Sequence, residues 1–82
     1  MPAVKNFRQN LRSAMQAKNI SQRNLASASQ MSYPHVNRIL QGHAGPGLRQ
    51  CDLLAKAVGI SLEVLLLPPK EFSKWLLTRV SF

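Results

Sequence analysis

The sequence predicts an all-α fold, and three observations support this prediction. Apolar residues recur at every third or fourth position in successive segments, which is the spacing of one face of an α-helix. Glycine, proline and helix-capping residues separate these segments. No segment shows the alternation of apolar and polar residues that is typical of a half-buried strand. Because domains have roughly 100–150 residues, the 82 residues are expected to form a single folded unit.

The first helix is expected over residues 4–18, where the apolar residues fall on one face. Asn19 is able to adopt the left-handed conformation that often ends a helix. Ser21 suits the N-cap of a second, short helix, because its side chain can accept a hydrogen bond from a free backbone N–H group. Leu25 and Ala26 mark the inward face of that helix.

The third helix opens with Tyr-Pro-His at positions 33–35, which places a proline where a helix begins. The first four N–H groups of a helix have no internal acceptor, so a proline in the first turn loses no hydrogen bond. Proline also disfavours the helical conformation for the residue before it, so the helix is expected to start at or just before Pro34. Its inward face is formed by Val36, Ile39 and Leu40.

A glycine-rich loop at residues 42–47 separates this helix from a fourth one over residues 48–58, which a further glycine ends. Ser61 suits the N-cap of a short fifth helix, and two prolines at positions 68–69 end it. Residues 70–81 have helical spacing again. The whole chain is therefore expected to consist of helices joined by short connections.

The chain has a net charge of +8, with eleven basic residues against three acidic ones. Residues 1–51 contain seven of the basic residues and no acid, so the positive field is concentrated there. This distribution indicates a polyanionic partner. A basic surface that serves only solubility is the alternative interpretation.

Catalysis and metal binding are not expected. The three acids stand apart in the sequence and no glycine-rich phosphate-binding motif precedes a helix, so no acid–base pair or nucleotide site is evident. The only cysteine, Cys51, excludes an internal disulfide, favours a reducing compartment and falls on the inward face of the fourth helix. Two histidines and one cysteine at scattered positions match no zinc-ligand spacing, so neither a metal nor a cofactor is predicted.

Membrane insertion is not expected either, because no apolar run approaches the roughly 18 residues of a membrane-spanning helix. Residues 1–20 are basic, amphipathic and free of acids, so an organelle transit peptide is an alternative interpretation of the first helix. We predict a cytoplasmic protein.

Two short helices joined by a tight turn are typical of a helix-turn-helix. Residues 21–42, SQRNLASASQMSYPHVNRILQG, resemble the DNA-binding unit of the phage Cro/repressor-type (XRE-type) family. The matching positions are Ser21, Gln22, Leu25, Ala26, Met31, Ser32, Val36, Ile39 and Gly42. Residues 53–66, LLAKAVGISLEVLL, resemble a second segment of that family. Gln30 replaces the glycine usual at the turn, so a non-glycine residue is expected to adopt a positive φ there.

The resemblance implies a five-helix phage-repressor-like DNA-binding domain over residues 1–67, with the helix-turn-helix in helices two and three. In such proteins the start of the second helix of the motif enters the major groove. The residues expected to contact bases are Tyr33, Pro34, His35, Asn37 and Arg38. Those expected to contact phosphates are Gln22, Arg23, Asn24, Gln41 and His43. The alternatives are a solvated charge for Arg38, packing for Tyr33 and a plain surface role for both histidines.

Residues 68–82 extend beyond this domain and are expected to form a self-association helix. On a helical wheel the apolar side chains cover a wider arc than the roughly 100° that one packing face needs, so the helix is expected to pack on its own domain and on a second copy. The expected interface residues are Phe72, Trp75, Leu76, Leu77, Val80 and Phe82. A membrane-surface helix is the alternative for this segment.

These observations predict a sequence-specific, non-enzymatic transcriptional regulator that binds double-stranded DNA, as a phage or prophage-type repressor on a two-fold operator. It is expected to act as a homodimer or a higher homo-oligomer in the bacterial cytoplasm, associated with the nucleoid, with an anti-repressor protein as a further partner. The alternative is an antitoxin or adaptor of the same fold, whose main partner is a protein such as a toxin.

Overall fold

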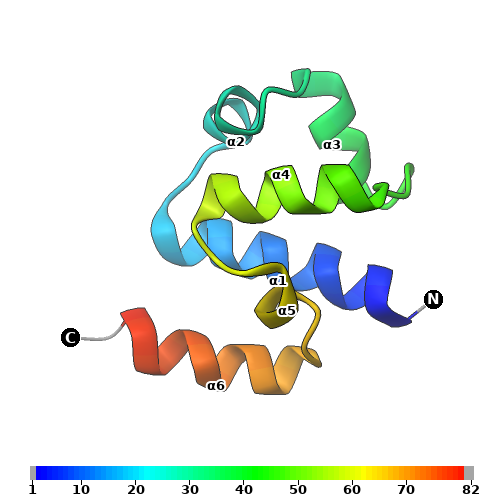
Figure 1. The fold of residues 1–82 in the computed structure, drawn as a ribbon. Coiled ribbons are helices and arrows are strands. Elements are labelled where there is room, and N and C mark those ends of the chain that lie inside the picture. Colours follow the sequence, from blue (N-terminus) through cyan, green and yellow to red (C-terminus); the bar gives the residue numbers. More distant parts are fainter. Residues whose placement is uncertain (1, 81–82) are drawn as a thin grey trace.

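The computed structural model describes residues 2–80, with the side chains of residues 3–79. Its helices are α1 (Pro2–Lys18), α2 (Gln22–Ser29), α3 (Tyr33–Gln41), α4 (Leu48–Val58), α5 (Leu62–Leu65) and α6 (Pro69–Val80). No strand occurs in this part of the chain, so the prediction of an all-α fold is confirmed. Figure 1 shows α2 and α3 at one end of the molecule and α6 at the other.

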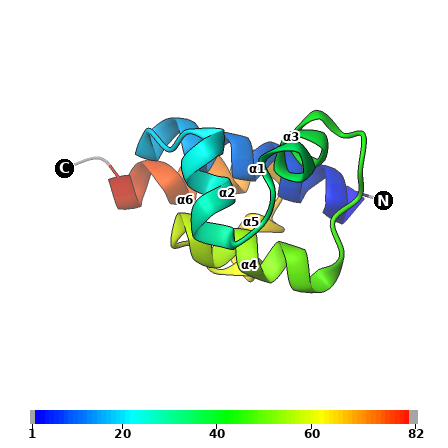
Figure 2. The same ribbon diagram turned by 90° about the horizontal axis from the view of Figure 1, so that it is seen from above.

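The long helix α1 holds the two ends of the molecule together. It contacts α3, α4, α5 and α6, while α2 packs on both α3 and α4. Figure 2 shows α2 running across the directions of α1 and α4, so the start of the helix-turn-helix segment lies over these two helices. Helix α1 therefore supports α3 on one side and α6 on the other.

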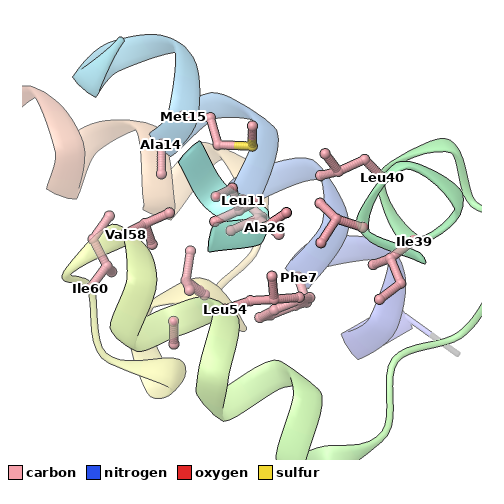
Figure 3. Close-up of a cluster of buried hydrophobic side chains, with 14 of the residues drawn as sticks. Phe7, Leu11, Ala14, Met15, Ala26, Ile39, Leu40, Leu54, Val58 and Ile60 are labelled. Carbon is pink, nitrogen blue, oxygen red and sulfur yellow. The ribbon is translucent and has the colours of Figure 1, made fainter. Parts of the chain in front are cut away.

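All the helices contribute to one hydrophobic core. Its buried side chains are Phe7, Leu11, Ala14, Met15, Leu25, Ala26, Val36, Ile39, Leu40, Leu54, Ala55, Val58, Ile60, Leu65 and Phe72. Figure 3 shows Phe7 and Leu11 of α1 between Leu54 of α4 and the side chains of Ile39 and Leu40 of α3. Complete burial of a large apolar side chain contributes about 1.5–3 kcal/mol, so this cluster is the main source of stability.

Serine hydroxyls cap the first turns of α2, α3 and α5. Each serine hydroxyl accepts a hydrogen bond from the backbone N–H group three residues further on. The pairs are Asn24 with Ser21 (3.1 Å), His35 with Ser32 (3.3 Å) and Val64 with Ser61 (3.4 Å). Such a cap contributes roughly 1 kcal/mol. The predicted caps at Ser21 and Ser61 are confirmed, and Ser32 adds a further one.

A buried asparagine fixes the connection between α5 and α6. Asn10 of α1 is 1% exposed and donates from Nδ2 to the carbonyl oxygens of Leu65 (3.0 Å) and Leu67 (2.7 Å). Leaving a buried polar group without a partner costs about 1–3 kcal/mol, so both bonds matter for the position of this connection.

Helix α6 is attached through Phe72, which is 0% exposed and belongs to the common core. This corrects the expectation that Phe72 takes part in self-association, because its whole surface is used within the protomer. Its ring stacks on Trp75 with 6.0 Å between the ring centroids, and Trp75 and Leu76 are half-buried. Leu77 is 67% exposed. The side chain of Val80 and all of Phe82, also predicted at the interface, lie outside the described part of the chain.

Candidate nucleic-acid interface

The turn between α2 and α3 sets the direction of α3. Gln30 has φ 60° and ψ 33°, and its N–H group bonds back to carbonyl oxygens in the last turn of α2. The N–H of Met31 donates to the carbonyl oxygen of Ala26 at 3.0 Å. Ser29 is buried, and its hydroxyl donates to the carbonyl oxygen of Leu25 at 2.7 Å. The predicted positive φ of Gln30 is confirmed, and these hydrogen bonds offset its cost of roughly 1–2 kcal/mol.

Helix α3 begins at Tyr33, with Pro34 in its first turn, as predicted. Its buried face consists of Val36, Ile39 and Leu40. On the opposite face Pro34 and Arg38 are exposed, and Tyr33 is 42% exposed. At the other end of the helix, Nη1 of Arg12 in α1 donates to the carbonyl oxygen of Leu40 at 2.8 Å. Helix α3 is thus held by its buried face and by α1, and its outward side chains are accessible.

A side-chain hydrogen bond joins α2 to α3. Nδ2 of Asn37 donates to Oε1 of Gln22 at 2.9 Å, and the pair is partly buried. The sequence placed Asn37 among the base contacts and Gln22 among the phosphate contacts, but did not pair them. The structure gives Asn37 a second role, because its amide holds α3 at a fixed rotation relative to α2.

An arginine–tyrosine contact also crosses the turn. The guanidinium carbon of Arg23 lies 5.3 Å from the centroid of the Tyr33 ring, within the range of a cation–π interaction. Both side chains are exposed, so such a contact contributes about 0.5–1 kcal/mol. It places a predicted phosphate-contacting cation beside a predicted base-contacting ring.

The first turn of α3 is linked to the first turn of α4 as well. Nε2 of His35 lies 3.1 Å from Nε2 of Gln50, and Oε1 of the same glutamine accepts from the N–H of Gly47 at 2.8 Å. Gln50 lies outside the helix-turn-helix segment and was not among the predicted site residues. No pattern in the sequence indicates that positions 35 and 50 meet.

Residues 11–65 match the family model described as helix-turn-helix, which covers more than half of the chain. The protein belongs to the helix-turn-helix family of the XRE type. This membership makes it a DNA-binding regulator in general, in a family that is not typically enzymatic. Comparisons with curated proteins and with solved structures found no match.

The remaining residues of this helix-turn-helix protein that were predicted to contact phosphates lie on α2, on α3 and in the loop after α3. Asn24 is exposed on α2, Gln41 on the last turn of α3, and His43 in the loop that follows. The backbone N–H of His43 donates to the carbonyl oxygen of Arg38 at 2.9 Å, so this loop folds back on the end of α3. These polar side chains are accessible on the same helix-turn-helix unit that carries Arg23.

Charge separates the helix-turn-helix unit from the helices that follow it. Residues 22–41 contain two arginines and no acid. Asp52 on α4 forms an exposed ion pair with Lys56, 3.2 Å from Oδ2 to Nζ, and together with Glu63 it lines a groove between α4 and α5. A polyanion therefore meets no repulsive side chain on α2 or α3.

The single cysteine is a packing residue. Cys51 is half-buried against the hydrophobic core, and burial raises the pKa of its thiol. The thiol is therefore neutral at physiological pH and is a poor nucleophile and metal ligand. Among the described residues, no helix is both long and apolar enough to cross a membrane.

Proposed function

We propose that the protein is a sequence-specific regulator that reads double-stranded DNA with the start of α3. The observation that carries this proposal is the exposed, acid-free outward face of α3, where Tyr33, Pro34 and Arg38 are accessible while the opposite face is buried. A helix held in this way is rigid enough to place side chains against base edges in the major groove.

Separate roles follow for the exposed side chains. The guanidinium of Arg38 suits a bidentate contact with O6 and N7 of guanine, and Tyr33 and Pro34 suit contact with thymine methyl groups. The side chains of Arg23, Asn24, Gln41 and His43 are assigned to phosphates, which fix the position of the protein without selecting a sequence. Gln22 is assigned to a phosphate in addition to holding Asn37.

The first test is a salt titration of DNA binding. Neutralising six to ten phosphates costs roughly 10³–10⁵ in affinity between 50 and 200 mM salt, so binding should weaken steeply over this range. A duplex selected from a random-sequence library and a scrambled duplex are compared throughout. Failure to bind any duplex even at low salt would overturn the proposal.

The second test separates base contacts from phosphate contacts. Arg38→Ala should cost about 1–3 kcal/mol on the selected duplex and relax the preference at one base position. Arg23→Ala should weaken binding to selected and scrambled duplexes alike. Equal losses on both duplexes for both variants would show that Arg38 does not read a base.

We further propose that the protein is a phage or prophage-type repressor that binds a two-fold operator as a dimer through α6, in the bacterial cytoplasm at the nucleoid. The support is the outward side of α6, where Leu77 is exposed beside the half-buried Trp75 and Leu76. Half-sites about 34–36 Å apart would match a symmetric dimer.

Because Phe72 belongs to the core, a point substitution tests this better than removal of the helix. Leu77→Glu should convert a dimer at micromolar concentration into a monomer in light scattering and weaken binding to a full operator. Thr78→Glu adds the same charge one residue further along α6 and serves as the control. A wild-type protein that is monomeric both alone and on DNA would overturn the role of α6.

A further inference from the structure

A chain of two hydrogen bonds connects the start of α4 to the start of α3. At one end the N–H of Gly47, the N-cap of α4, donates to Oε1 of Gln50 at 2.8 Å. At the other end Nε2 of Gln50 lies 3.1 Å from Nε2 of His35, in the first turn of α3. Gln50 therefore provides an acceptor for the N–H of the N-cap residue and meets His35 with the same amide group.

The bond from Gly47 determines the chemistry of the contact with His35. A backbone N–H only donates, so the amide atom of Gln50 that faces it must be the oxygen. The other end of the amide is then the NH₂ group, which only donates. Nε2 of His35 must therefore accept, and a neutral imidazole that accepts at Nε2 carries its proton on Nδ1.

We infer that Gln50 is a positioning residue for DNA reading, an inference that rests on the proposed function. Gln50 holds His35 as the neutral Nδ1–H tautomer and fixes the rotation of the ring against α4. The ring then offers Nδ1–H as its single donor to an acceptor on DNA, whereas Nε2 is occupied within the protein. The link also holds the first turn of α3, which carries Tyr33 and Pro34, against the first turn of α4.

Two substitutions of Gln50 distinguish this role from simple packing. Gln50→Met keeps the length and helix propensity of the side chain but neither donates nor accepts in this way. Gln50→Glu can still accept from the N–H of Gly47, but its carboxylate cannot donate to the ring. The carboxylate should instead accept from the ring and so draw the proton to Nε2.

Nitrogen-15 NMR of the imidazole rings at about pH 8, where an ordinary histidine is neutral, reports which ring nitrogen carries the proton. In the wild type His35 should be protonated at Nδ1 and unprotonated at Nε2. Gln50→Met should reduce this bias, and Gln50→Glu should move the proton to Nε2. His43, exposed in the loop, is the internal reference and should not change. A wild-type His35 protonated at Nε2, or a tautomer unaffected by both substitutions, would overturn the inference.

A double-mutant cycle connects the tautomer to DNA reading. Gln50→Met should lower affinity for the selected duplex about three- to tenfold, as expected for the loss of one hydrogen bond at the interface. In a His35→Ala background the same substitution should have almost no further effect. Losses that simply add would show that Gln50 does not act through His35. If the wild type binds no duplex, the proposed function fails, while the ring spectra still decide whether Gln50 sets the tautomer.

Discussion

The α2–α3 unit and helix α6 both bury apolar side chains in the core, but α3 adds side-chain contacts between polar groups of neighbouring helices. Polar contacts tie α3 to its neighbours: Asn37 bonds Gln22 of α2, and His35 meets Gln50 of α4. Helix α6 is attached mainly by the apolar Phe72, which enters the core next to α1. Directional hydrogen bonds specify the rotation and tilt of a helix, whereas apolar burial is non-directional and mainly determines whether the helix is attached.

This difference suits the two proposed roles. A helix that reads base edges must hold its side chains in place to within about half an ångström. Hydrogen bonds from α3 to neighbouring helices restrict its movement in this way. A helix that meets a second copy needs accessible apolar surface, and Leu77 on α6 is exposed in this way. The strength of each kind of attachment can be measured separately.

The largest effect is expected where α6 enters the core. Phe72→Ala should lower the free energy of unfolding by about 3–5 kcal/mol, because it leaves a cavity at a fully buried position. Urea unfolding followed by circular dichroism measures the change. Lys74→Ala on the exposed side of the same helix should stay within about 0.5 kcal/mol. If Phe72→Ala does not fold, Phe72→Leu should show a smaller loss in the same direction. Equal losses for Phe72→Ala and Lys74→Ala would contradict the comparison.

A smaller effect is expected where α2 and α3 meet. Gln22→Ala removes the acceptor of the Asn37 amide, so the free energy of unfolding should fall by about 1 kcal/mol, at the low end for a partly buried group. The same variant should also bind DNA more weakly. Gln41→Ala, exposed on α3, is the matched control for stability and should be close to neutral. If Gln22→Ala leaves the free energy of unfolding unchanged, the hydrogen bond between Gln22 and Asn37 does not stabilise α3.

The smallest effect is expected at the turn and has the opposite sign. Gln30→Gly relieves a left-handed conformation at φ 60°, but glycine also loses more conformational freedom on folding, so the free energy of unfolding should rise by only about 0.5 kcal/mol. Ser27→Gly within α2 is the control and should cost about 0.5–1 kcal/mol, because glycine is unfavourable inside a helix. A loss for Gln30→Gly would indicate that the glutamine side chain contributes contacts that offset its backbone strain.

Sequence alone determined the helices, the ends of α2, α3 and α4 and the buried face of α3. These features depend on residues within a few positions of one another: Ser21 caps α2, Pro34 occupies the first turn of α3, and Gln30 adopts the positive φ that the motif requires. The helical spacing of apolar residues also assigned Val36 and Ile39 to the core correctly. Periodicity and capping are local, so a single chain reports them directly.

Only the tertiary structure decided which polar groups of different helices meet. Asn37 and Gln22 are separated by fifteen positions, as are Gln50 and His35, and no local rule pairs them. The same limit applies to α6, where the apolar arc did not distinguish Phe72, which is buried within the protomer, from Leu77, which is exposed. A pattern gives the face on which a residue lies, but the partner of that residue depends on how the helices cross, and many distant contacts set those crossings together.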